Sequence, residues 1–456
     1  MADDVPYRPF APAPRARPAN LAELLWLMWR DPLKIWSRRH FREPVIWGEG
    51  RFGRAITVSN PEGVRHVLLE NAKAYEKGQV QRRVLGPLLA QGMLLTEGET
   101  WKRARRTVAP LFAPRRLRGA NGRMHAIAEN RVDEWLAGRV GQVLDVDSEM
   151  TRLTFEMLSA TLFSDEIGDQ AEGFERAVTR YAETAARADP LDVMGAPDWI
   201  PRAGRILGGG AAKWFEDSVT RLVRERRERL RTGDAPDDLM TALLRAQDPE
   251  TGVGLSDEEV SSNILTFILA GHETTARALG WTFHLLARTP HIREKVAHEA
   301  DGLDLAAEDW IERLPLTRAV FEEAMRLYPP APVITRSAVE DDEVNGVPVY
   351  PGTTVLIAPW VIHRHELLWD DPGAFRPERF LPGEREKVDR FAYLPFGGGP
   401  RICVGATFAM QEAALIIAAV CRRTRLEAVG KADPTPTQRI TLRAKEGLKL
   451  RLEGRN

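Results

Sequence analysis

One stretch of this 456-residue chain predicts a helix long enough to cross an entire globular body. Ser256 and Glu259 form a capping box, the side-chain pair that commonly begins a helix. Apolar residues then recur at helical spacing until about Arg288, just before Pro290, which gives about 33 residues and a length of about 50 Å. Because its middle, Val260–Gly271, carries no charge, we expect this helix to run through the core.

The composition excludes several classes of protein. The chain has 64 Lys and Arg against 65 Asp and Glu, which argues against a basic nucleic-acid binder and an acidic disordered chain. Two cysteines, Cys403 and Cys421, are too few for a disulfide framework or a cysteine-rich zinc module, so we expect a reduced, cytoplasmic protein. We expect no transmembrane anchor, since no apolar run reaches the roughly 20 residues that a span needs.

The pattern predicts two parts, residues 1–39 and 40–456. The first part is a Pro-rich arm, expected to be mobile, followed by a short amphipathic helix over Leu21–Trp36. The arm lacks the apolar region of a signal peptide. We expect the helix to pack on the body of the protein, with weak peripheral membrane contact as the alternative.

The remaining pattern predicts a mainly α protein with small, separate β sheets. Helical spacing marks TFEMLSATLF, AVTRYAETAARA and FEDSVTRLVRERRERLR, and the basic run in the last is interpreted as a solvated helix face. Strand signals are few. Val45–Ser59 predicts a hairpin, Val344–Ala358 predicts two strands, and Ile440–Glu453 predicts one more pair.

The most informative stretch is FGGGPRICVG, residues 396–405. Its glycines form a turn where backbone can approach a flat, bulky group. Cys403 precedes an apolar helix, and the helix N-terminus together with Arg401 would lower the pKa of its thiol. A nucleophile would need a nearby His, which the loop lacks, whereas a lone thiolate in a glycine loop suits haem iron. Cys421, in mid-helix among apolar residues, is expected to be buried and inert.

This loop resembles the haem-binding loop of the cytochrome P450 family, and the resemblance extends over roughly residues 40–455. The motif positions are occupied by Phe396, Gly397, Gly399, Arg401, Cys403 and Gly405. The resemblance implies the cytochrome P450 fold, in which residues 40–456 form a single haem-enclosing catalytic domain around the long central helix. It also implies haem b (iron protoporphyrin IX) as cofactor and Cys403 as the ligand of its iron.

The long helix carries AGHETT, Ala270–Thr275, in its middle. Gly271 could allow close approach of a flat ligand, and Thr274 could bond back to a helical carbonyl and open the helix locally. Glu273 is a carboxylate in an uncharged stretch, which is costly unless it is paired or functional. The resemblance implies that Glu273 and Thr274 relay protons through water to dioxygen. His272 is expected to point away from the site.

Two further sets of residues are expected to support the haem. Glu323 and Arg326 lie at i, i+3 on one helix face, and the resemblance adds Arg379 to form a structural network that holds the cysteine loop. The haem carboxylates would be bound by an aromatic residue and three arginines, since guanidinium groups pair well with carboxylates. These residues are Trp101, Arg105, Arg336 and Arg401.

The resemblance implies a monooxygenase that inserts one oxygen atom from O2 into an apolar substrate, by hydroxylation or epoxidation. Electrons would come from a separate partner, a ferredoxin with its reductase or a flavodoxin. Arg422 and Arg423 are candidates for its docking face, with solvated helix-end charges as the alternative. Three other functions stay open: a peroxygenase driven by H2O2, a haem-binding protein without turnover, and a thiol nucleophile at Cys403.

By the same resemblance, the substrate pocket would draw on Gly78–Thr96, Tyr181–Leu207, the long helix and Ala331–Thr335. The apolar candidates are Val80, Leu88, Leu89, Met93, Leu94, Phe267 and Val333. This lining suits a lipid, a fatty acid or a terpenoid, although binding pockets are mostly apolar in general.

Overall fold

The computed structural model describes residues 5–50, 53–164, 173–174, 176–177, 180–181, 184, 189–193, 196–197, 199–307 and 309–455. The chain divides into two compact units. Unit 1 comprises Met1–Glu76, Asn121–Leu153 and Thr274–Asn456, and unit 2 comprises Lys77–Ala120 and Thr154–Glu273. The boundary falls inside helix α12 (Asp257–Arg288), between Glu273 and Thr274.

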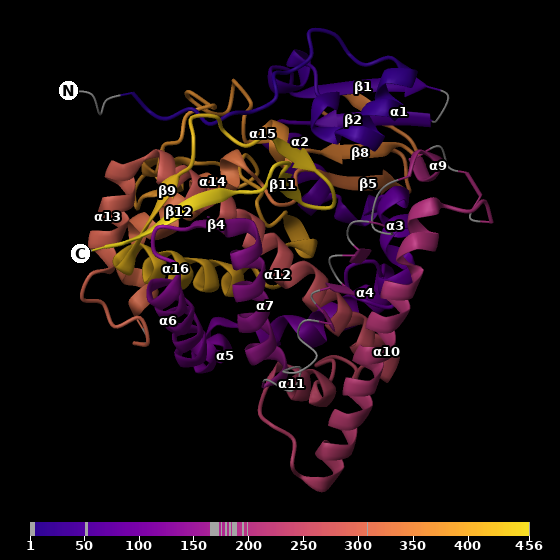
Figure 1. Cartoon of the computed structure of the whole chain (residues 1–456). Helices are drawn as coiled ribbons and strands as arrows, with labels where there is room; N and C mark the ends of the chain where they lie inside the picture. Colours follow the sequence, from indigo (N-terminus) through magenta and orange to yellow (C-terminus); the bar gives the residue numbers. More distant parts are fainter. Residues whose placement is uncertain are drawn as a thin grey trace. The chain divides into compact units, whose positions relative to one another are not determined.

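Helices make up most of both units (Figure 1). The helices of unit 1 are α1 (Leu21–Arg30), α2 (Pro61–Arg65), α6 (Asn121–Gly138), α13 (Pro290–Ala300), α14 (Pro315–Leu327), α15 (Pro359–Ile362) and α16 (Ala406–Arg423). Those of unit 2 are α3 (Gln79–Leu89), α4 (Gly98–Val108), α5 (Pro114–Leu117), α9 (Pro190–Val193), α10 (Ala203–Thr232) and α11 (Leu239–Arg245). Like α12, α7 (Val146–Phe163) contributes to both units.

The strands of the described residues form four small sheets. Their bounds are β1 (Val45–Gly50), β2 (Gly53–Val58), β3 (Tyr75–Lys77), β4 (Val143–Asp145), β5 (Ile334–Ala338), β6 (Asp342–Val344), β7 (Val347–Val349), β8 (Thr354–Ile357), β9 (Thr424–Ala428), β10 (Pro436–Gln438), β11 (Leu442–Ala444) and β12 (Lys449–Gly454). The largest sheet has the order β1-β2-β8-β5-β3. Its β1 and β2 pair antiparallel, so the predicted hairpin at Val45–Ser59 is confirmed.

The two strands predicted in Val344–Ala358 are confirmed as β7 and β8, whereas the pair predicted in Ile440–Glu453 is wrong, because β11 and β12 join different sheets. In Val344–Ala358, β7 pairs with β6 and β8 joins the largest sheet between β2 and β5. In the C-terminal segment, β11 pairs with β10, whereas β12 lies between β4 and β9. Alternating apolar residues predict that a segment is a strand, but they do not say which strand will be its neighbour.

The N-terminal arm is bound to unit 1 rather than projecting from it as a mobile segment. The Tyr7 hydroxyl donates to an oxygen of Asp433 at 2.5 Å, and the Phe375 amide donates to the Tyr7 carbonyl at 2.8 Å. Helix α1 begins at the capping box of Asn20 and Glu23, and it ends at Arg30 rather than near Trp36. Pro32, which lacks an amide hydrogen, begins a separate 3-10 turn.

Helix α12 follows its prediction closely. Ser256 and Glu259 exchange hydrogen bonds at 2.8 and 3.2 Å, so the capping box is confirmed. The apolar residues between them and the centre of the helix, such as Ile264 and Ile268, are buried. No helix among the described residues is both long enough and apolar enough to span a membrane.

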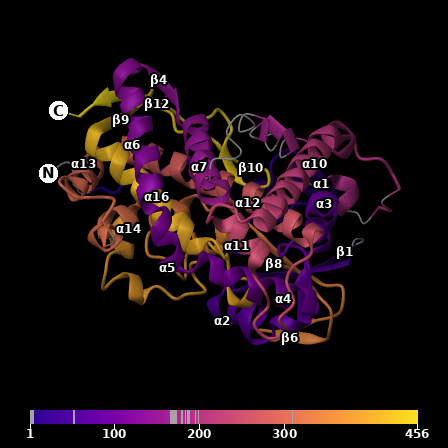
Figure 2. The same ribbon diagram turned by 90° about the horizontal axis from the view of Figure 1, so that it is seen from below.

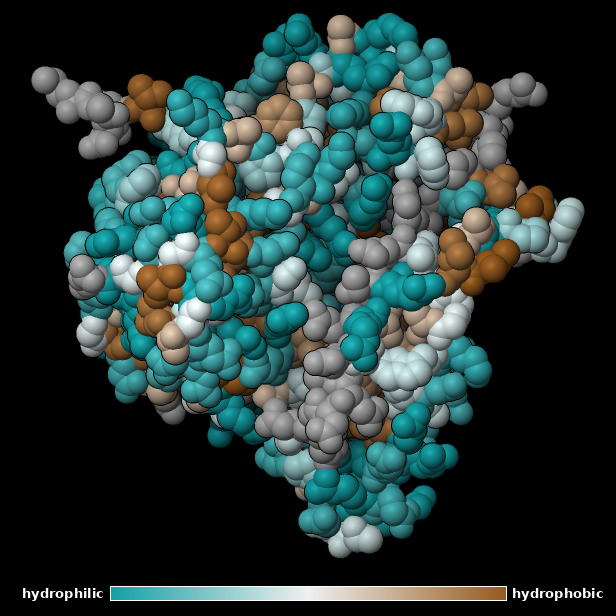
Figure 3. Space-filling model, viewed as in Figure 1, coloured by the Kyte–Doolittle hydropathy of each residue, from teal (hydrophilic) through white to brown (hydrophobic). Residues whose placement is uncertain are grey.

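Two of the three helices predicted before α12 are confirmed. TFEMLSATLF lies in α7 and FEDSVTRLVRERRERLR lies in α10, whereas AVTRYAETAARA falls largely outside the described residues. The end of α10 is largely hydrophilic (Figure 3). However, the basic run is not uniformly solvated, because Arg226 is buried and pairs with Asp238 at 2.5 Å. Sequence cannot mark one arginine of such a run as buried without knowing what packs on that face.

Candidate functional site

The cysteine loop of unit 1 is fixed by its own backbone. The Cys403 amide donates to the Phe396 carbonyl at 2.9 Å, and the Ile402 amide donates to the Gly399 carbonyl at 3.1 Å. Cys403 is exposed and lies shortly before α16, as the sequence predicts. Cys421, by contrast, is buried within α16, and burial raises the pKa of its thiol to about 12. The two cysteines therefore have opposite environments, and the expectation for Cys421 is confirmed.

The glycines of the loop serve different purposes. Gly399 has a φ of +66°, and a Cβ there would lie 1.7 Å from the carbonyl oxygen of Leu68, so packing of this chain requires glycine. At Gly405, φ is −88° and an added Cβ would meet no protein atom within 4 Å. Neither backbone conformation nor protein packing demands a glycine at 405, two residues after Cys403. A flat group lying close to the backbone there would demand one.

Glu323 and Arg326 of α14 form a fully buried ion pair, with both side chains 0% exposed. The pair is bidentate, since Arg326 Nε lies 2.6 Å from Glu323 Oε2 and Arg326 Nη2 lies 2.7 Å from Oε1. The other three N–H bonds of Arg326 donate to the carbonyls of His363, Pro372 and Ala374. All five donors of this guanidinium are thus used, which offsets the cost of burying its charge.

Arg379 lies at the edge of the same network. Its Nε is 3.7 Å from Glu323 Oε1, and its Nη2 donates to the carbonyls of Asp370 and Asp371 at 2.5 and 3.0 Å. Burial lowers the pKa of the Arg379 guanidinium, and the nearby Glu323 carboxylate opposes that shift. Arg379 is therefore a longer, weaker partner of Glu323 than Arg326 is.

The four residues expected to bind haem carboxylates lie in both units. In unit 1, Arg336 is buried on β5 opposite Val355 of β8, and Arg401 is half-buried in the 3-10 turn Gly399–Arg401. In unit 2, Trp101 and Arg105 are half-buried and one turn apart on α4.

The acid and the alcohol predicted for α12 fall on either side of the unit boundary. Glu273 is buried in unit 2, and Thr274 is half-buried in unit 1. Gly271 packs against unit 2 itself, because a Cβ there would lie 3.2 Å from both terminal methyl groups of Leu158. Packing against Leu158 therefore explains why residue 271 is a glycine, and no flat ligand is needed to explain it.

His272 is buried in unit 2 and has a structural environment. Its Nδ1 lies 2.6 Å from the Ile268 carbonyl oxygen, one turn earlier on α12. Its ring packs edge-on against Phe155 of α7, with the ring centres 5.5 Å apart. The hydroxyl of Thr154 donates to the His272 carbonyl at 3.0 Å. The side chain therefore lies against α7 within unit 2.

Sequence reasoning missed two buried titratable residues near the predicted site. His363, just after α15, receives a hydrogen bond from the Leu394 amide, two residues before Phe396. Glu412 is fully buried on α16, where burial raises the pKa of its carboxyl well above the usual value. Nine apolar or small residues, Ala413–Cys421, follow Glu412 in the sequence, and a lone acid beside such an apolar run was the available signal.

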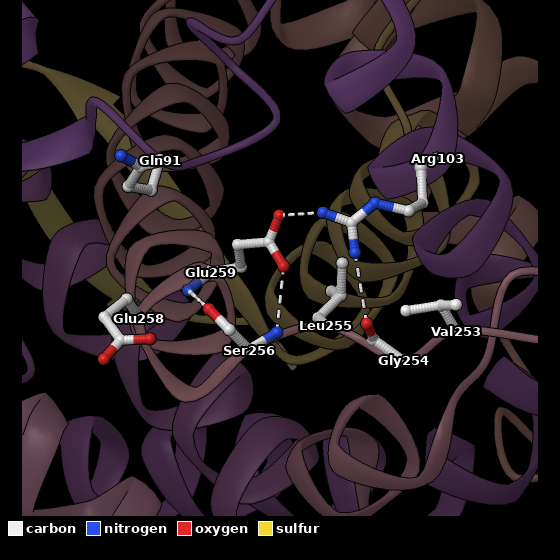
Figure 4. Close-up of a pocket in the computed structure, with 8 residues that line it drawn as sticks. All are labelled: Gln91, Arg103, Val253, Gly254, Leu255, Ser256, Glu258 and Glu259. Carbon is white, nitrogen blue, oxygen red and sulfur yellow. Dashed lines mark hydrogen bonds and ion pairs between the residues drawn. The ribbon is translucent and has the colours of Figure 1, made fainter.

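A pocket of about 760 Å3 lies in unit 2 at the beginning of α12 (Figure 4). Arg103 forms an ion pair with Glu259 and donates to the Gly254 carbonyl at 3.1 Å. Gln91 of the expected segment Gly78–Thr96 and Glu258 and Glu259 of the long helix line this pocket, but none of the seven apolar candidates does. Of the apolar candidates, Val80, Leu88, Leu89, Met93, Leu94 and Phe267 belong to unit 2 and Val333 to unit 1, whereas much of Tyr181–Leu207 lies outside the described residues.

The proposed docking arginines are neutralised by acids of α6, which packs along α16 (Figure 2). Arg422 lies 2.7 Å from Glu129, and Arg423 lies 3.0 Å from Glu129 and 2.6 Å from Asp133. Both arginines at this helix end are thus paired, and the sequence does not reveal which acids α6 presents to them.

Comparisons with known proteins agree with this geometry. The profile of the cytochrome P450 family matches residues 21–451. Cyclooctatin synthase of Streptomyces melanosporofaciens is 34% identical over 84% of this chain and 83% of its own length. Cyclooctat-9-en-7-ol 5-monooxygenase of the same organism is 32% identical over 93% of this chain and 91% of its own. The crystal structure of the cytochrome P450DA heme domain superposes with a TM-score of 0.83 at 26% identity, covering 98% of this chain and 99% of that one.

The chain belongs to the cytochrome P450 family. It has the fold of that family and is a haem-thiolate monooxygenase, an oxidoreductase that uses O2, an organic substrate and electrons from a redox partner. The residues present fit a haem, since an exposed thiol, a soft ligand for iron, lies two residues from a glycine that protein packing does not explain.

Proposed function

We propose that Cys403 would bind the iron of haem b, and that this protein hydroxylates or epoxidises an apolar, terpenoid-type substrate. The proposal rests chiefly on the pairing of the exposed Cys403 with Gly405, in a loop whose backbone is tied at Phe396. When bound, the haem supplies the activation of O2, of which one atom enters the substrate and the other leaves as water after uptake of two electrons and two protons.

Four residues would hold the two haem carboxylates. Arg336, Arg401 and Arg105 supply positive charge and planar donors, and Trp101 adds an indole N–H beside Arg105 on α4. The aromatic ring of Phe396 and the bare backbone of Gly405 would face the ring system. The buried network of Glu323, Arg326 and Arg379 would keep the loop in place without touching the reacting atoms.

Glu273 and Thr274 would move the protons that the reaction consumes. Glu273 is a buried acid within an uncharged helical stretch, an environment that enzymes use to hold a general acid. The Thr274 hydroxyl follows it directly in sequence and can both accept and donate a hydrogen bond. Together they would pass protons through ordered water, and substitution of either would leave electron consumption uncoupled from product.

The electron donor would be a ferredoxin with its reductase, or a flavodoxin. Because Arg422 and Arg423 are already paired with acids of α6, they would contribute little to attracting an acidic partner.

An apolar substrate is supported by the candidate lining residues and by the compounds named for two relatives. Phe267 packs edge-on against Phe112 within unit 2, and Leu88, Leu89 and Met93 are buried there. One relative's name gives cyclooctat-9-en-7-ol as its substrate. A substrate of this kind would bind mainly by burial of apolar area.

We also propose a cytoplasmic location with weak peripheral membrane contact through α1. Trp26 and Trp29 of this helix are 54% and 53% exposed, and the Arg30 guanidinium lies 5.4 Å from the Trp26 ring centre. Tryptophan favours the boundary between lipid and water, and arginine favours anionic headgroups. Flotation with anionic vesicles, compared between the native protein and Trp26→Ser/Trp29→Ser, tests this contact; equal flotation would contradict it.

The proposed reaction is tested with the purified protein, a heterologous ferredoxin and reductase, NADPH, and cyclooctat-9-en-7-ol as the first probe. We expect one labelled oxygen in the product under 18O2 and none under 18O-labelled water. Product that depends on H2O2 alone, or label that comes from water, would contradict the proposal. Cys403→Ala is the matched variant and should form no product.

A further inference from the structure

His363 joins the buried ion network to the backbone that leads into the cysteine loop. It follows α15 and is fully buried. Arg326 Nη1 donates to the His363 carbonyl at 2.7 Å, and His363 Nδ1 lies 3.3 Å from the Arg326 carbonyl oxygen. His363 Nε2 lies 2.8 Å from the Leu394 amide nitrogen. The imidazole therefore contacts the buried ion network through Nδ1, and through Nε2 it contacts the backbone that leads into the cysteine loop.

These partners assign one protonation state to the ring. The Leu394 amide can only donate, so Nε2 must be the acceptor and carries no proton. Nδ1 then carries the proton and donates to the Arg326 carbonyl. Burial, with help from the charges of Arg326 and Arg364, lowers the pKa of His363 to about 3. The neutral ring is thus the stable form throughout the physiological range.

The segment beyond Leu394 is hydrogen-bonded as far as Cys403. The Gly397 amide donates to the Leu394 carbonyl at 3.2 Å, and the Cys403 amide donates to the Phe396 carbonyl at 2.9 Å. Leu394 is itself buried, so its amide would have no access to water if the imidazole were removed. An unsatisfied buried amide would favour a shift of this backbone, and the shift would reach the residues that hold the sulfur.

We propose that His363 is a positioning residue for Cys403, one that transmits the fixed geometry of the Glu323–Arg326 pair to the cysteine loop through the Leu394 amide. This inference rests on the proposed role of Cys403 as the iron ligand. His363 does not touch the sulfur, and it acts only through the backbone that it holds.

The test compares His363→Gln with His363→Leu in the haem-loaded protein. A Gln side chain can place its carbonyl oxygen near the position of Nε2 and accept from the Leu394 amide, whereas Leu cannot. The measured quantity is the rate at which the thiolate-type Soret band of the reduced CO complex converts to the band of non-thiolate haem. We expect at least a tenfold faster conversion in His363→Leu and a rate within about threefold of the native protein in His363→Gln.

His365 supplies a matched control. It is buried two residues further on, and its ring nitrogens lie 3.2 Å from the Glu43 carbonyl oxygen and 3.3 Å from the Leu367 amide nitrogen. Neither partner belongs to the network or the loop. His365→Leu should lower the melting temperature while converting at the native rate. Equal conversion rates for His363→Leu and His365→Leu would overturn the inference, as would a Gln variant as fast as Leu.

If His363→Leu does not fold, a variant with a shorter amide side chain provides a second test. His363→Asn can reach the Arg326 carbonyl from the position of Nδ1 but falls short of the Leu394 amide. It should therefore convert faster than His363→Gln, and equal rates would overturn the inference. A native protein that shows no thiolate-type band at all would instead refute the ligand role of Cys403, so the two failures are distinguishable.

Discussion

Two fully buried glutamates on packed helices of unit 1 have opposite surroundings. Glu323 of α14 faces the guanidinium of Arg326 and the amide of Arg376, at 2.6 and 2.8 Å. Burial raises the pKa of the Glu412 carboxyl on α16, and the Thr275 hydroxyl opposes that shift. No charged side chain of the described residues contributes to it. A buried carboxylate with a cation can remain charged, whereas one without a cation is held in its neutral form. The first acid belongs to an ion network, and the second is held in its protonated, neutral form.

The largest expected effect comes from removing the bidentate partner of Glu323. Arg326→Leu would leave the buried Glu323 carboxylate with only the longer contact to Arg379 at 3.7 Å, and three carbonyls without donors. We expect a loss of about 3–5 kcal/mol in the free energy of unfolding, together with poor haem retention. Urea unfolding and the ratio of haem to protein measure both. Lys387→Met, which breaks an exposed pair with Glu384, is the control and should change neither quantity appreciably.

Glu412→Gln sharpens the comparison through pH. The folded-state pKa of Glu412 is raised, so its stabilising contribution is complete below the unfolded pKa and is lost as pH rises toward the folded pKa. The native protein should therefore lose up to about 1.4 kcal/mol per pH unit relative to Glu412→Gln above roughly pH 4.5. Unfolding free energies of both proteins between pH 5 and pH 8 provide the measurement. Parallel curves would show that Glu412 is charged in the folded protein.

Arg379→Met should have a smaller effect than Arg326→Leu, because Glu323 keeps its bidentate partner. The variant removes a contact of 3.7 Å and leaves two carbonyls without their donor. We expect a loss of about 1–2 kcal/mol in the free energy of unfolding, measured by urea denaturation. A loss as large as that of Arg326→Leu would mean that the network is a balanced triad rather than a pair with a peripheral member.

The smallest expected effect lies at the exposed end of α16. Arg423→Gln removes a cation whose charge is already balanced by Glu129 and Asp133. Affinity for a ferredoxin should change by less than about threefold at low ionic strength, since paired surface charges add little to association. Surface plasmon resonance with the native protein as reference measures this. A tenfold loss of affinity would instead support the end of α16 as a docking face for the redox partner.

The sequence predicts the elements of this fold better than their partners. The capping box of α12 and the β1–β2 hairpin are local features, because hydrogen bonds between near neighbours define them. The pairing of β12 with β4 joins segments about 300 residues apart, and no local pattern specifies it. The same limit explains Arg226, Arg422 and Arg423, whose acidic partners lie on other elements.

In the candidate site, too, local motifs could be predicted from sequence, whereas contacts between distant segments could not. The spacing around Cys403 is a local motif, so the loop could be placed from sequence. His363 and His365 stand two residues apart and are both buried, yet only His363 reaches the backbone before the loop. Glu323 could be paired from sequence because Arg326 follows it by three residues on the same helix, and Glu412 could be recognised as a lone acid before an apolar run. Tertiary packing decides that both are fully buried.

The most direct measurement is the absorption spectrum of the purified protein, reduced under carbon monoxide, beside that of Cys403→Ala. We expect a strongly red-shifted Soret band in the native protein and its loss in the variant, while His363→Gln retains it. A haem band without that shift in the native protein, or an unchanged shift in Cys403→Ala, would contradict the assignment of Cys403 as the iron ligand.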